Sequence, residues 1–172
     1  MGMVWSMGER KFRSNWKKKR RLFDALMQSV MMYGAEIWGW CERPEIERVQ
    51  ETYLRWNLGV DRSTPKYAVR NETGRYKLAV LASRRALKFE ERMSKCEGGS
   101  IRKECWKLWT GGRPDTGYSR DRKNFLEKVG WSLERRKEEL SRRENKWREM
   151  ERKNRRLGRH EEGRKIQESN YL

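Results

Sequence analysis

The segment from Arg21 to Val60 holds the densest apolar and aromatic clustering in an otherwise polar chain. Its first part has the 3.6-residue period of a core-facing helix, carried by one row, Leu22, Leu26, Val30 and Ile37, with Phe23, Met27 and Met31 beside it. Gly34 is expected to end this helix, because glycine adopts positive φ at little cost. Pro44 suits the first turn of a second helix, which Gly59 should stop. The sequence therefore predicts a helical hairpin that buries Leu26, Val30, Trp38, Val49, Tyr53 and Trp56.

No alternating strand pattern persists anywhere, so the predicted fold class is all-α. A basic and aromatic segment, 1–17, should precede a small helical bundle over 18–95. Short helices and a Gly-rich linker are expected over 96–130, then a long charged helix over 131–158 and a disordered tail over 159–172. Leu133, Leu140 and Trp147 fall seven apart in that helix, with Met150 and Leu157 on a partner row. This thin heptad seam permits weak oligomerisation, but a solvated helix with Glu/Lys and Glu/Arg pairs four apart is favoured.

Charge is the second strong feature of the chain. Lys and Arg number 43 against 25 Asp and Glu, a net charge of +18. Such an excess indicates an anionic partner, either nucleic acid or a membrane surface. Between Arg10 and Arg21 the chain is rich in Lys and Arg and has no acid, which suits a phosphate-contacting patch, a solvated helix start or a nuclear-localisation run. No apolar run approaches the roughly 20 residues of a membrane span. Of the two anionic partners, nucleic acid is expected and a membrane is not.

Two stretches, YGAEIWGW and IERVQETYLRWNLGVDRSTPKYAVR, carry a family resemblance. They resemble the thumb that follows the catalytic palm in reverse transcriptases of non-LTR (LINE-like) retrotransposons. The match covers residues 5 to about 95 well and the remainder loosely. The signature positions are Tyr33, Gly34, Glu36, Trp38, Gln50, Tyr53, Leu54, Arg55, Trp56, Thr64 and Pro65.

The resemblance implies a helical thumb that grips a primer–template or RNA–DNA hybrid, without the catalytic centre. Two-metal polymerase chemistry needs carboxylates that hold two cations about 4 Å apart. The four aspartates, Asp24, Asp61, Asp115 and Asp121, are never adjacent. We therefore expect no polymerase activity from this chain alone, no metal site and no cofactor. The missing polymerase palm would be a possible partner.

Nine basic residues are the candidate contacts to an RNA, DNA or hybrid backbone. They form two groups that flank the apolar hairpin, although each alone could be a solvated surface charge. The aromatic residues of the hairpin have core spacing, so Trp40, in the predicted turn, is the candidate for base stacking. The nine candidates are Lys17, Lys18, Lys19, Arg20, Arg21, Arg55, Arg62, Lys66 and Arg70.

Three other functions remain open from the sequence. A helical protein-interaction module could use residues 131–158 as a weak coiled coil. The opening MGMVWS matches an acylation pattern, which would place a lipid on Gly2 beside a basic cluster. The chain could also be the non-functional product of a decayed retroelement. The three scattered cysteines suit thiols in a reducing compartment, so an intracellular location, nuclear or cytoplasmic, is expected.

Overall fold

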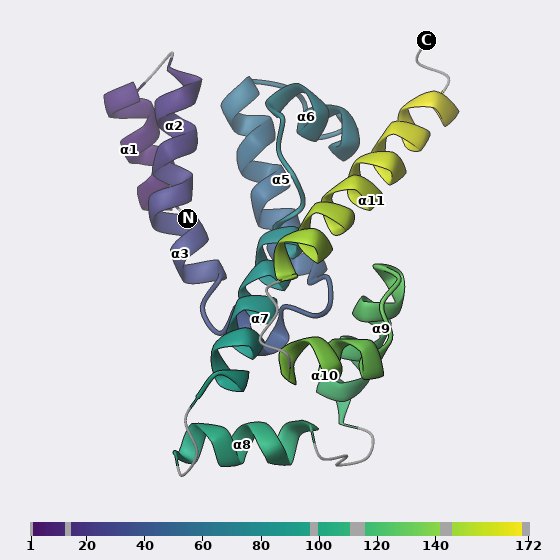
Figure 1. Cartoon of the computed structure of the whole chain (residues 1–172). Helices are drawn as coiled ribbons and strands as arrows, with labels where there is room; N and C mark the ends of the chain where they lie inside the picture. Colours follow the sequence, from purple (N-terminus) through teal and green to yellow (C-terminus); the bar gives the residue numbers. More distant parts are fainter. Residues whose placement is uncertain (1, 13–14, 97–99, 111–115, 142–145, 170–172) are drawn as a thin grey trace. The chain divides into compact units, whose positions relative to one another are not determined.

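The computed structural model describes residues 2–12, 15–96, 100–110, 116–141 and 146–169 (Figure 1). Within these ranges every regular element is helical, which confirms the all-α prediction. The elements in chain order are α1 (Gly2–Phe12), α2 (Trp16–Leu22), the π-helical turn η1 (Phe23–Met27), α3 (Gln28–Met31), α4 (Ala35–Trp38), α5 (Pro44–Leu58), α6 (Lys66–Thr73), α7 (Leu78–Ser94), α8 (Ile101–Thr110), α9 (Gly117–Lys128), α10 (Leu133–Ser141) and α11 (Trp147–Glu168).

The chain divides into two compact units. Unit 1 comprises Met1–Tyr33, Arg43–Leu78 and Gly158–Leu172, and unit 2 comprises Gly34–Glu42 and Ala79–Leu157. Helix α11 therefore contributes its first half to unit 2 and its second half to unit 1. This division does not follow the boundaries expected from composition, because most of α7 belongs with the helices that come after it.

Unit 1 is built around an aromatic core supplied by α1, α2, η1 and α5. The rings of Phe23 and Tyr53 lie 4.6 Å apart, and Val4 is buried beside them. The Tyr53 hydroxyl donates a hydrogen bond to the carbonyl oxygen of Lys19 at 2.7 Å, so its polar end is satisfied inside the core. Helix α5 begins at Pro44 and is capped by Gly59 with φ 68°, as the sequence predicts. Local signals therefore place this helix correctly.

The predicted buried row of the first helix is wrong at three of its four positions, while Leu22 packs against the core. Leu26 and Ile37 are exposed, and 73% of the Val30 surface is exposed. The π-helical turn η1 explains the error within unit 1, because an i→i+5 turn shifts the helical phase by one residue. The neighbouring row of Phe23, Met27 and Met31 faces the core instead.

Unit 2 has a core of its own, which the composition did not indicate. Its buried apolar side chains come from the turn after α4, from α7, from α9 and the segment that follows it, and from α11: Trp40, Ala86, Leu87, Phe125, Leu126, Val129, Trp131, Trp147 and Met150. A second cluster packs α8 and α10 against α7 through Met93, Trp106 and Leu140. The helices after residue 95 are therefore part of a packed unit and are not loosely attached.

The predicted long solvated helix over 131–158 is also wrong. Lys146 lies outside any helix, so α10 and α11 are separate elements. The residues of the heptad seam divide between these two helices, and Leu140, Trp147 and Met150 are used in the core of unit 2. Helix α11 runs to Glu168, where a disordered tail was expected, and residues 170–172 lie outside the described ranges. In the described part of the chain, no helix has both the length and the apolar character needed to cross a membrane.

Candidate nucleic-acid interface

Two of the nine candidate contacts are buried, and their prediction as phosphate contacts is wrong. Lys19 is 6% exposed: its Nζ lies 2.9 Å from Glu9 Oε1 and 4.3 Å from the centroid of the Trp56 ring. It occupies the inward face of α2, one turn before Phe23, so the helical phase turns it away from solvent. The aromatic face and the carboxylate together compensate the buried ammonium group.

Arg70 is the second buried candidate, with 3% of its surface exposed. Its Nη1 lies 2.6 Å from Glu51 Oε1 on α5, and its Nε lies 2.5 Å from Glu162 Oε1 on α11. The guanidinium thus joins three helices of unit 1. Because its donors are engaged by two carboxylates, Arg70 holds the unit together and does not face a phosphate.

Arg20 and Arg55 are half-buried and bind the backbone of their own unit. Arg20 Nη1 donates to the carbonyl oxygen of Thr73 at 3.3 Å, at the end of α6. Arg55 Nε donates to the carbonyl oxygen of Thr64 at 3.0 Å, just before α6. These two bonds fix α6 and the preceding loop against α2 and α5, so both arginines act as positioning residues.

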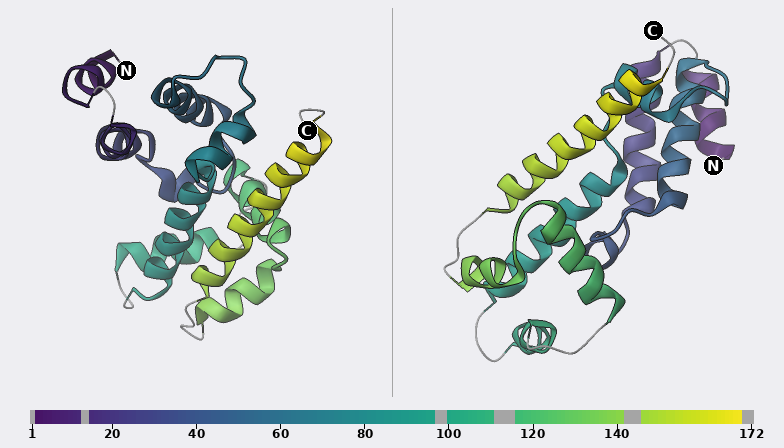
Figure 2. Two further views of the ribbon diagram at one scale, coloured as in Figure 1. Left: turned by 90° about the horizontal axis from the view of Figure 1, so that it is seen from above. Right: turned by 90° about the vertical axis from the view of Figure 1, so that its right-hand side faces the viewer.

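The five remaining candidates are exposed and come from two segments of unit 1. Asn57 Nδ2 donates to the Trp16 carbonyl oxygen at 3.1 Å, which ties the start of α2 to the last turn of α5. Figures 1 and 2 show the start of α2, the end of α5 and the start of α6 at the same end of the unit. Lys17 and Lys18 lie in the first turn of α2, Arg62 and Lys66 lie at the approach to α6, and Arg21 lies in the last turn of α2. We call the five together the basic end: Lys17, Lys18, Arg21, Arg62 and Lys66.

The backbone of the basic end is held by local hydrogen bonds. Asn15 caps α2, its side chain accepting from the Lys18 N–H at 3.0 Å. In the loop before α6, the Ser63 N–H donates to Asp61 Oδ1 at 2.7 Å. The Ser63 side chain and backbone hydrogen bonds lower the pKa of Asp61, so this exposed carboxylate is charged at neutral pH. Asp61 therefore offsets part of the positive charge at this end.

The predicted stacking residue, Trp40, is buried. It packs edgewise on Phe125, with ring centroids 5.6 Å apart, and on Tyr118 at 6.2 Å. The turn that carries it is part of the unit 2 core, which sequence periodicity could not show. Trp16 is the exposed aromatic residue next to the basic candidates, with 40% of its surface exposed. Its position directly before five Lys and Arg residues was the available signal.

Most signature residues of the resemblance have structural roles. Tyr53 and Leu54 are buried, and Gln50 Nε2 donates to the Tyr76 carbonyl oxygen at 3.0 Å. Pro65 is the N-cap of α6, one residue earlier than the predicted first helical position. Three others are half-buried: Glu36, Trp38 and Trp56. Gly34 has φ 67° at the start of α4, and Tyr33 is exposed although its spacing suggested the core.

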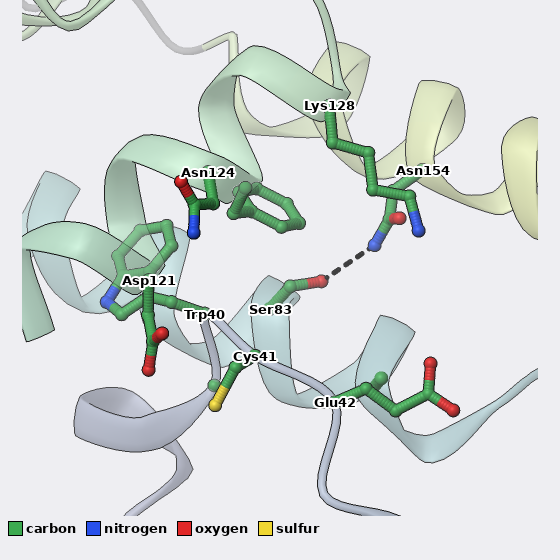
Figure 3. A pocket seen from close by; sticks show the side chains of 11 residues that line it. Trp40, Cys41, Glu42, Ser83, Asp121, Asn124, Lys128 and Asn154 are labelled. Carbon is green, nitrogen blue, oxygen red and sulfur yellow. Dashed lines mark hydrogen bonds between the residues drawn. The ribbon is translucent and has the colours of Figure 1, made fainter. Parts of the chain in front are cut away.

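Unit 2 contains a separate cavity of about 220 Å³ (Figure 3). Polar side chains line much of it, and two of them are hydrogen-bonded: Asn154 Nδ2 donates to Ser83 Oγ at 3.1 Å. None of the nine candidate contacts lines this cavity. Among the residues the structure describes, no group of three or more His, Cys, Asp or Glu side chains could hold a metal ion.

Comparisons with protein-family models, with curated proteins and with solved structures found no match to this chain.

Proposed function

We propose that unit 1 binds the phosphate backbone of a nucleic acid through the basic end. The observation that carries this proposal is a set of five exposed cations on two neighbouring segments of one unit. Four of them, Lys17, Lys18, Arg62 and Lys66, come from the first turn of α2 and from the approach to α6, and Arg21 lies in the last turn of α2. Arg20 and Arg55, which are close to these cations in the sequence, instead donate hydrogen bonds that hold α6 and its loop in place. The exposed cations therefore stand on a backbone that is already ordered, which lowers the entropy cost of binding.

The proposed binding is electrostatic and independent of sequence. Lys and Arg side chains neutralise phosphates and release condensed counterions, and phosphate contacts position a duplex without reading its bases. In keeping with the thumb resemblance, the expected partner is a primer–template or RNA–DNA hybrid. The chain would hold the duplex, while the chemistry of polymerisation would belong to a palm that is not in this sequence. We propose no enzymatic activity for this chain.

Titration of a labelled RNA–DNA hybrid at several salt concentrations tests the proposal. If the five cations of the basic end each neutralise one phosphate, the log–log salt slope should be about −4 to −5. Micromolar binding at about 50 mM salt that weakens with this slope supports the proposal. Absence of binding at that salt concentration, or a slope near zero, contradicts it.

A further inference from the structure

Trp16 is an exposed aromatic side chain held on a fixed backbone. It lies outside the aromatic cluster of unit 1, whose half-buried members include Trp5 and Trp56. Its carbonyl oxygen accepts the bond from Asn57, and Asn15 caps the helix that it begins. The backbone that carries the ring is therefore held in place, and the ring is not part of the aromatic cluster of unit 1.

The surroundings of Trp16 combine apolar surface with positive charge. Lys17 Nζ lies 5.8 Å from the centroid of the Trp16 ring, and Lys18 follows in the chain. Val60, also exposed, comes three residues after Asn57, so a second apolar group lies at this end. Arg62 then follows in the same loop. An aromatic ring and an aliphatic group thus lie on the same two segments as Lys17, Lys18 and Arg62.

An exposed aromatic ring beside cations suits an unpaired nucleic-acid strand better than a fully paired duplex. A duplex presents phosphates and sugars to a protein surface and keeps its base faces stacked inside. An unpaired strand offers base faces, and aromatic side chains next to phosphate-binding cations are the usual means of holding them. Every base has a π face, so such a contact requires no particular sequence.

We propose that Trp16 stacks on an unpaired base, so that the basic end favours single strands and single-strand–duplex junctions over fully paired duplexes. This inference rests on the proposed function and deepens it by naming the class of nucleic acid. The cations would hold the phosphates on either side, and Trp16 would supply the contact that a blunt duplex lacks.

The test compares three probes with the full chain: a short single-stranded RNA, a blunt RNA–DNA hybrid, and the same hybrid with a single-stranded overhang. Trp16→Ala should weaken binding of the single strand and the overhang about 5- to 100-fold and change blunt-duplex binding by less than about twofold. Trp16→Phe should restore most of the lost affinity, because its ring also stacks. Leu26→Ala, which truncates another exposed side chain of unit 1, is the matched control and should have no effect.

Two results would overturn the inference while leaving the proposed function in place. One is an equal loss of affinity for all three probes on Trp16→Ala, which would show that Trp16 only positions the residues that contact the phosphates. The other is no loss for any probe. If the wild-type chain binds none of the three probes, both the proposed function and the inference are overturned. Far-UV circular dichroism of each variant distinguishes lost binding from lost folding.

Discussion

The two units differ in how they pair their buried cations. Unit 1 buries Lys19 and Arg70 against carboxylates of neighbouring helices and leaves the five cations of the basic end exposed. Unit 2 places Arg122 and Arg136 against a single carboxylate, Glu90, and all three side chains are buried. The many Lys and Arg residues of the sequence therefore have two roles: some form an exposed surface, and others are buried in ion pairs. The following predictions test that difference, from the largest effect to the smallest.

Removal of the Glu90 carboxylate should have the largest effect. Glu90→Ala leaves two buried guanidinium groups without their shared partner, and breaking a buried ion pair in this way costs about 3–5 kcal/mol. Denaturant unfolding followed by tryptophan fluorescence measures the loss. Glu104→Ala is the control, because the exposed Glu104–Lys107 pair should contribute at most about 1 kcal/mol.

Simultaneous replacement of the Glu90, Arg122 and Arg136 side chains by Leu or Met sharpens this prediction. If Glu90→Ala destabilises the protein because the buried guanidinium groups of Arg122 and Arg136 lose their partner, the apolar triple variant should recover most of the lost stability. A triple variant as unstable as Glu90→Ala would show that the three side chains are needed for their shape and hydrogen bonds.

Arg70→Met tests the equivalent buried cation in unit 1. Glu51 and Glu162 would each lose a charge-assisted hydrogen bond, and the expected loss is about 1.5–3 kcal/mol. The matched control is Lys66→Met on the same helix, which is exposed and should change stability by less than about 0.5 kcal/mol. A larger loss for Lys66→Met than for Arg70→Met would contradict the assignment of one residue to the surface and the other to the interior.

Tyr53→Phe removes the hydrogen bond to the Lys19 carbonyl oxygen and should cost about 1 kcal/mol at neutral pH. Burial, with a smaller contribution from the Asp24 carboxylate, raises the pKa of Tyr53 to about 12. The unfolded chain releases this proton near pH 10, so the folded state retains it while the unfolded state does not. The contribution of Tyr53 is therefore complete below about pH 10 and is lost as pH rises towards 12. Urea midpoints between pH 9 and 11.5 should fall less steeply for Tyr53→Phe than for the wild type.

The smallest effect is expected for Val30→Ser on α3. Val30 is mostly exposed, so its replacement should change the free energy of unfolding by no more than about 0.5 kcal/mol. A loss above about 2 kcal/mol would place Val30 in a core, as its spacing alone had suggested.

Helix ends and part of the unit 1 core could be predicted from the sequence because their causes are local. Pro44 and Gly59 bound α5 through their own backbone preferences, and α6 ends at Thr73 beside a glycine. Burial of Tyr53 follows from its spacing within α5. The phase of the preceding helix could not be predicted, because the π-helical turn at Phe23–Met27 interrupts the regular period.

Unit 2 and part of the candidate interface depend on partners far along the chain. Glu90 pairs with Arg122 and Arg136 across 32 and 46 residues, so no local pattern marks these arginines as buried. Charge counting likewise could not separate Lys19 from its exposed neighbours in α2, because helical phase and the position of Trp56 decide its burial. The basic segment could be recognised from the sequence, but only the packing of the helices shows which of its residues are exposed.

Comparison of two variants of equal charge most directly tests the central claim. In one, the five cations of the basic end are replaced by Gln; in the other, five exposed cations of unit 2 are replaced: Arg120, Lys123, Lys128, Lys137 and Arg152. Binding of an RNA–DNA hybrid carrying a single-stranded overhang is measured against salt for both. We predict that the basic-end variant loses most of its affinity and its salt slope, while the unit 2 variant keeps a slope near that of the wild type. Equal losses in the two variants would show that net charge alone drives binding and would contradict a localised interface on unit 1.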